Sequence, residues 1–142
     1  MRWNKINTLI DLENFMTIFG SFHDSCIKEL KYISGAFVST DLGMNPINNT
    51  RSLKIIFQRQ YKNPTTIEIE FAELSNLILS PVNSNFTCEL QGASMFIKEG
   101  KIYWYDCDEI ENPIDGYEGT CICANSVKWR YADEYTGNKE IY

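Results

Sequence analysis

The chain has 142 residues, a formal net charge of −6, 44% apolar residues and 23% charged residues. This is the composition of an ordinary globular protein, and the length predicts one domain, 1–142, with one core. The negative charge argues against nucleic acid and against an anionic membrane surface as partners, because both require clustered Lys and Arg. No apolar run is long enough for a membrane span and no secretory signal is recognisable, so we expect a cytoplasmic location.

An amphipathic helix is predicted from about Thr8 to Phe19. Apolar residues recur at steps of three and four along it, at Leu9, Leu12, Met16 and Phe19. Thr8 is a suitable N-cap, and Gly20 supplies the residue type that commonly follows a helix end.

Strand character dominates the rest of the chain. Strands are predicted at 26–34, 53–58, 67–71, 77–79, 86–98, 101–105 and 121–131. Residues 35–50 are predicted to form a variable connection. Parallel crossovers need a dozen or more residues each, and no second helical pattern is present. The predicted fold is therefore α+β, with the N-terminal helix packed on a curved, mostly antiparallel, meandering sheet of about seven strands, partly barrel-like.

The segment Phe22-His23-Asp24-Ser25 joins the helix to the first strand and contains the one histidine of the chain. A Ser-His-Asp triad is the chemistry that these residue types suggest. Neighbours in an extended chain point to opposite faces, so His23 and Asp24 are not expected to pair as a triad requires. We therefore expect a structural turn here, and a hydrolase-like enzyme that uses His23 as general base stays an alternative.

The order of elements around this segment carries a resemblance. A short opening helix, then Phe22-His23-Asp24-Ser25, then alternating strands that end in a Trp-bearing strand resemble a group of small uncharacterised bacterial proteins. Some members of that group are similar to immunity proteins of contact-dependent or polymorphic toxin systems. The resemblance implies a protein partner, and it carries no catalytic residue.

The five cysteines are an odd number in a chain large enough to fold without disulfides, so free thiols are expected. Cys121 and Cys123 fall on one face of the last predicted strand, together with Val127 and Trp129. A zinc site completed by Cys107 or His23 would depart from the usual Cys-x₂-Cys spacing. We expect a protein without metal and without cofactor.

The segment between Lys101 and Lys128 contains six acidic residues and no basic one. It lacks the glycine and glutamate positions of a calcium-binding loop. Paired carboxylates for glycoside hydrolysis are one possibility, but acids on a predicted flexible loop do not supply the fixed separation that this chemistry needs. Two other interpretations stay open, a solvated loop and a partner-binding surface with aromatic anchors. In the second interpretation, the contact residues are Asp106, Asp108, Glu109, Glu111, Tyr103, Tyr105 and Tyr117.

These observations favour a non-enzymatic protein-binding domain, of the immunity type, that neutralises a basic toxin through an acidic face. The partner is then a basic protein, and the chain is a monomer or a weak dimer. One alternative is a small-molecule-binding domain whose aromatic-lined pocket contains His23, Asp24, Trp104 and Trp129. The other alternative is the hydrolase that uses His23.

Overall fold

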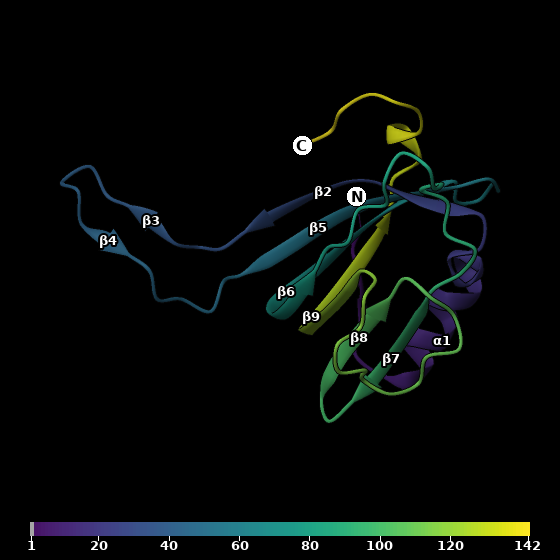
Figure 1. Cartoon of the computed structure of the whole chain (residues 1–142), viewed down its shortest axis with the longest axis horizontal. Coiled ribbons are helices and arrows are strands. Elements are labelled where there is room, and N and C mark those ends of the chain that lie inside the picture. Colours follow the sequence, from purple (N-terminus) through teal and green to yellow (C-terminus); the bar gives the residue numbers. More distant parts are fainter. Residues whose placement is uncertain (1) are drawn as a thin grey trace.

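The computed structural model describes residues 2–142 and shows one helix and one large antiparallel sheet (Figure 1). The predicted α+β class is thereby confirmed. The α-helix is α1 (Leu9–Ile18), and short 3-10 turns lie at Gly20–Phe22 and Asp133–Tyr135. The strands are β1 (Asn4–Ile6), β2 (Ser25–Ile33), β3 (Phe37–Val38), β4 (Met44–Asn45), β5 (Ser52–Arg59), β6 (Thr66–Ile78), β7 (Ser94–Lys98), β8 (Lys101–Tyr105) and β9 (Cys121–Tyr131). Within residues 2–142, no helix is both long enough and apolar enough to span a membrane.

A capping box begins α1. The Thr8 Oγ1 accepts a hydrogen bond from the Asp11 amide at 3.1 Å, and the Asp11 carboxylate accepts one from the Thr8 amide at 3.0 Å. The same carboxylate accepts a bond from the Asn7 amide at 2.9 Å. These backbone donors, Asn7 foremost, hold the pKa of Asp11 below its usual value. The predicted helix and its Thr8 cap are confirmed.

The large sheet has the order β2-β5-β6-β9-β8-β7. On the side of β9 that faces away from β6, β8 pairs with residues 121–124 and β1 pairs with residues 127–129. The last strand in the chain thus lies between β6 and β8, so the sheet is not a simple meander. β2 and β7 are the two edges, and the sheet is not closed into a barrel. A single long β6 covers the region in which two separate strands were predicted, at 67–71 and 77–79.

The sheet coils because its strands contain irregularities. Glu73 in β6 has a left-handed backbone with φ +50°, and the register with β9 shifts between Leu74 and Asn76. In β9 the buried face changes between Ala124 and Val127, so the core takes Ile122 and Ala124 from the first half of the strand and Val127 and Trp129 from the second half. The expectation that Cys121 and Cys123 share a face with Val127 and Trp129 was therefore wrong.

Aromatic rings form the centre of the core between α1 and the sheet. Phe22 is fully buried, and its ring centroid lies 4.9 Å from that of Phe57, 5.2 Å from Phe19, 5.7 Å from Trp104 and 5.8 Å from Phe15. The turn after α1 thus places one side chain against both the helix and the sheet.

Residues 34–51, which we call the arm, project far from the rest of the molecule between β2 and β5 (Figure 1). Sequence analysis predicted a connection here. The structure shows that the arm contains the short hairpin β3–β4, in which Phe37 pairs with Asn45 and Val38 with Met44.

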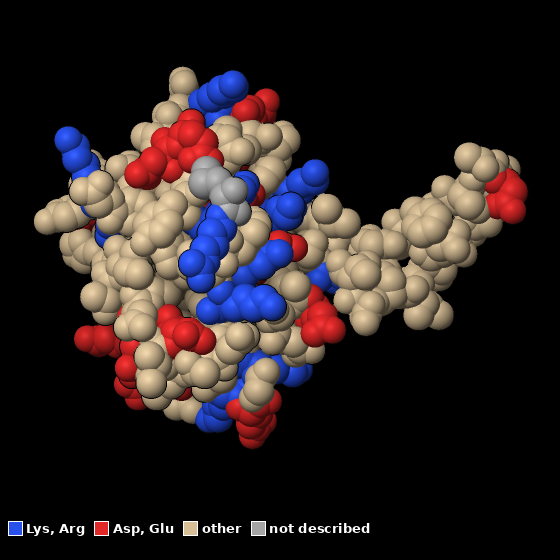
Figure 2. All heavy atoms as spheres, turned by 180° about the vertical axis from the view of Figure 1, so that it is seen from behind, with Lys and Arg blue, Asp and Glu red and all other residues tan. Residues whose placement is uncertain are grey.

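The sheet face opposite α1 carries a row of basic side chains that composition alone did not reveal. The cross-strand register aligns Lys31, Lys54, Glu70, Lys128 and Lys5 in this row. Figure 2 shows Lys and Arg gathered near the middle of the molecule seen from behind, with acidic side chains among them.

Ion pairs neutralise part of this row and its neighbours. Lys128 Nζ lies 3.3 Å from a Glu70 oxygen, and Arg130 lies 2.7 Å from Glu68. The Trp3 ring packs beneath both cations, at 4.8 Å from Lys128 Nζ and 4.9 Å from Arg130 Cζ. This face is consequently neutralised only in part, because Lys5, Lys31 and Lys54 form no ion pair among residues 2–142.

Candidate functional site

The connection between β8 and β9, residues 106–120, is called the acidic loop below. Five of its six carboxylates are exposed, and they belong to Asp108, Glu109, Glu111, Asp115 and Glu118. Asp106, the sixth, is partly buried at the start of the loop. None of the ion pairs formed among residues 2–142 involves a carboxylate of this loop.

Asp106 closes the acidic loop at its base. Its carboxylate accepts hydrogen bonds from the Tyr117 hydroxyl and from the Thr120 amide, the latter at 3.0 Å. Burial and the neighbouring Asp106 carboxylate raise the pKa of Tyr117, which keeps the hydroxyl protonated as a donor. A Cβ atom at Gly119 would lie 2.3 Å from Asp106 Oδ1 and 2.6 Å from the Tyr117 ring, so glycine is required for this close approach.

Two further side chains fasten the middle of the acidic loop. The Tyr105 hydroxyl accepts a hydrogen bond from the Ile114 amide at 3.0 Å. Ser94 Oγ donates to the Cys107 carbonyl at 2.7 Å and accepts from the Ile110 amide at 2.9 Å. The backbone of the loop is therefore held by β7 and β8, and its exposed carboxylates take no part in holding it.

The aromatic residues predicted as partner contacts lie in different environments. Tyr105 is 4% exposed and packs edge-on against Tyr117, with ring centroids 4.9 Å apart. Tyr103 is partly exposed and stacks on Phe96 of β7 at 5.0 Å. Tyr103 and Tyr117 are thus accessible in part, whereas Tyr105 serves to position the loop.

Cys121 and Cys123 lie beneath the same loop, in register with Tyr105 and Tyr103. Burial, and then the charge of Asp106, raise the pKa of the Cys121 thiol, which disfavours the thiolate. All five cysteines are free. Over residues 2–142, no group of three or more His, Cys, Asp or Glu side chains is placed to hold a metal ion.

The segment Phe22-His23-Asp24-Ser25 forms a tight turn whose backbone is left-handed at Phe22 and Asp24, with φ +63° and +53°. Because of this turn, His23 Nδ1 lies 3.0 Å from an Asp24 carboxylate oxygen. The argument that these neighbours cannot pair was wrong, since it assumed an extended chain.

A catalytic triad is nevertheless not assembled in this turn. The Ser25 hydroxyl is buried and donates to the Phe22 carbonyl oxygen at 2.6 Å. The His23 and Asp24 side chains are 70% and 53% exposed. Ser25 thus closes the turn, while the His23–Asp24 pair faces solvent.

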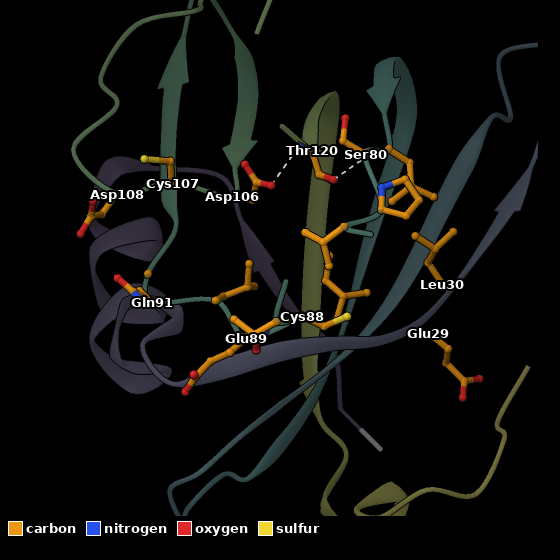
Figure 3. A pocket seen from close by; sticks show the side chains of 17 residues that line it. Glu29, Leu30, Ser80, Cys88, Glu89, Gln91, Asp106, Cys107, Asp108 and Thr120 are labelled. Atoms are coloured by element: carbon orange, nitrogen blue, oxygen red, sulfur yellow. Dashed lines mark hydrogen bonds between the residues drawn. The ribbon is translucent and has the colours of Figure 1, made fainter. Parts of the chain in front are cut away.

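A cavity of about 580 Å³, here called the edge cavity, lies beside the edge strand β2 (Figure 3). Its wall comes from β2, from the connection 79–92 and from the acidic loop. Its apolar lining consists of Ile27, Leu30, Leu79, Pro81, Val82 and Leu90. Figure 3 shows Leu30, Cys88 and Asp106 around it, and Thr120 bonded to both Asp106 and Ser80.

The residues predicted to line an aromatic pocket are dispersed. Trp104 and Trp129 are core residues, 0% and 5% exposed, and neither lines the edge cavity. Asp24 lines a second cavity of about 570 Å³ near Arg59, and His23 projects into solvent. Sequence analysis did not identify the edge cavity because its wall joins three segments that are distant in the chain.

Comparisons with protein-family models, with curated proteins and with solved structures give no match to this chain.

Proposed function

We propose that the protein is a non-enzymatic binding domain that uses its acidic loop to bind a basic protein, in the manner of an immunity protein that neutralises a toxin. One observation carries the proposal. The exposed carboxylates of the loop have no ion-pair partner among residues 2–142, whereas the loop backbone is fixed by Asp106, Tyr105 and Ser94.

The fixed backbone favours binding for an entropic reason. A loop that is already ordered loses little conformational freedom when a partner binds. Clustered charges of one sign also accelerate encounter with an oppositely charged surface. The carboxylates on the sheet face opposite α1, such as Glu68 and Glu70, lack this potential because Arg130 and Lys128 neutralise them.

The other two functions have weaker support. The hydrolase alternative requires a cleft around His23, but this side chain is 70% exposed and lines neither of the two cavities. The small-molecule alternative was based on an aromatic lining, and the lining of the edge cavity contains no aromatic side chain within residues 2–142.

A charge-neutral loop variant tests the proposal. Asp108→Asn, Glu109→Gln and Glu111→Gln are combined, and a control combines Glu13→Gln, Glu73→Gln and Glu140→Gln, which are also exposed. Both variants lose three negative charges. Partners are captured from a lysate of the cells that make the protein, and association is then measured with the purified partner.

We expect the loop variant to associate at least about tenfold more slowly, while the control keeps most of the wild-type rate. Raising the salt from about 50 to 300 mM should slow the wild type, because it shortens the Debye length. Equal association rates for wild type and loop variant, with both folded, would refute the proposal.

A further inference from the structure

The arm exposes apolar side chains that a folded protein usually buries. Five of them are more than half exposed, namely Phe37 at 59%, Val38 at 53%, Met44 at 65%, Leu42 at 84% and Ile47 at 94%. Residues 35–50 contain a single charged residue, Asp41. Figure 2 shows the arm as uncharged surface except at its outer end. Exposed apolar side chains gathered on one segment are typical of a binding site.

Local hydrogen bonds give the arm a defined shape. At its tip, the Ser39 amide donates to the Gly43 carbonyl and the Leu42 amide donates to the Ser39 carbonyl, both at 2.9 Å. At its base, Gly35 has φ +81°, and a Cβ atom there would lie 2.3 Å from Thr50 Oγ1. The arm is thus a preformed hairpin that keeps its apolar side chains outside the core.

The edge cavity has the chemistry that such an arm requires. Its wall is largely apolar, and its volume of about 580 Å³ holds several aliphatic side chains. The arm of the same chain leaves β2 after Ile33 and points away from the body (Figure 1), whereas the cavity contacts β2 at Ile27 and Leu30. An arm from another molecule can approach the cavity from solvent.

We propose that two copies of this chain associate reciprocally, with the arm of each seated in the edge cavity of the other. A two-fold arrangement closes both contacts at once. If each of the five side chains buries about 100 Å² and each arm covers the smaller surface of the cavity wall, the two contacts bury roughly 1,400 Å², within the range of a stable interface.

Charge determines which part of the chain can approach a second copy. Two molecules of net charge −6 repel each other over most of their surfaces. The arm has one acidic residue, Asp41, and one basic residue, Arg51, so it carries no net charge and approaches another copy with little repulsion. Because Asp106 and Asp108 lie at the cavity, salt should leave this association unchanged or strengthen it.

Two charge insertions test the arrangement. The arm variant carries Leu42→Asp and Ile47→Asp, and the cavity variant carries Val82→Asp, at a lining residue that is 48% exposed. Ile10→Asp, at an apolar residue of α1 that is 68% exposed, is the control. Circular dichroism establishes that each variant is folded, and sedimentation velocity measures its oligomeric state.

We expect a wild-type dimer, an unchanged Ile10→Asp dimer, and a dissociation constant raised about 100-fold or more in the arm and cavity variants. Mixing the arm variant with the cavity variant should give a dissociation constant between that of the wild type and those of the single variants, because one of the two contacts then joins an intact arm to an intact cavity. A monomeric wild type at about 100 μM would overturn the proposal, since it corresponds to a Kd too weak for this area.

Other outcomes also decide. Dimers that dissociate in the arm variant but persist in the cavity variant would show arm-to-arm pairing and overturn the seating in the cavity. A mixture that associates no more tightly than either variant alone would also overturn the seating of the arm in the cavity. The two proposals share Asp108, which lines the edge cavity, and salt distinguishes them. Binding of a basic partner should weaken with salt, whereas the association of two copies should not.

Discussion

The Asp106 carboxylate and the Tyr117 hydroxyl are hydrogen-bonded across the base of the acidic loop, at positions 11 residues apart in the sequence. The same carboxylate binds the amide of Thr120, the residue that precedes β9. One partly buried acid therefore sets where the loop begins and where it ends, while the other carboxylates stay in solvent.

Gly119→Ala should open this base. The new Cβ would overlap the Asp106 carboxylate and the Tyr117 ring, so the two must separate. We expect faster amide exchange across residues 106–120 and a loss of about 1–3 kcal/mol in unfolding free energy. Gly92→Ala is the control, since its nearest neighbour would be Asp108 Cβ at 3.4 Å, an ordinary contact. Unchanged exchange in Gly119→Ala would contradict the closing role of Asp106.

Stability should fall in alkaline solution partly because of Tyr117. Its pKa is raised in the folded protein by burial and by Asp106. A raised pKa contributes stability that is complete below the unfolded value of about 10 and is lost as the pH rises above it. Thermal unfolding between about pH 8 and 11.5 should therefore show a shallower alkaline decline in Tyr117→Phe than in the wild type.

Tyr142 provides an independent comparison, because it bonds to Glu68 and not to the acidic loop. Its hydroxyl donates to Glu68, and its pKa is raised by burial and by that carboxylate. Tyr142→Phe should reduce the alkaline decline by the same mechanism without altering amide exchange in the acidic loop. Identical alkaline profiles for the wild type and both variants would contradict the assignment.

Phe22→Ala should be among the most destabilising single substitutions. The ring is fully buried against four other aromatic rings, and removing it leaves a cavity in the core. Urea denaturation should show a loss of about 3–5 kcal/mol. Phe86→Ala, at a ring that is 69% exposed, should lose less than about 0.5 kcal/mol. Similar losses for the two variants would mean that Phe22 is not central to the core.

Ser25 should contribute more to the unfolding free energy than His23 does. Ser25→Ala removes the donor to the Phe22 carbonyl, and we expect a cost of about 1–3 kcal/mol. His23→Ala changes an exposed side chain and should cost less than about 0.5 kcal/mol. Hydrolytic turnover that is found in a substrate screen and lost in His23→Ala would support the enzyme alternative instead.

Features with local causes were predictable from the sequence. The capping residue Thr8 and the apolar spacing of 8–19 specify α1, and alternation specifies the β5–β6 hairpin. The position of β9 between β6 and β8 was not predictable, because strand order depends on packing between distant segments. The His23–Asp24 contact was missed because a left-handed aspartate is uncommon and has no sequence signature.

The position of the acidic loop was predictable from its charge, but its fixed backbone conformation was not. A run of exposed acids suggests a flexible segment, and the opposing information lies in single groups such as Tyr105 and Ser94 that appear ordinary in the sequence. The burial of Tyr105 follows from the loop folding back over it. The arm was likewise treated as a connection, because its two strands are only two residues long.

In the acidic loop, the residues that hold the backbone are different from the residues that face solvent. Asp106, Tyr117, Gly119 and Thr120 close the base, whereas positions 108, 109, 111 and 115 have no role in the hydrogen bonds that fix the backbone. Substitution at these outer positions can therefore alter which surface is recognised and leave folding intact. The base of the acidic loop thus has the property sought in a display scaffold, in which exposed residues are substituted to change binding preference while the fold stays the same.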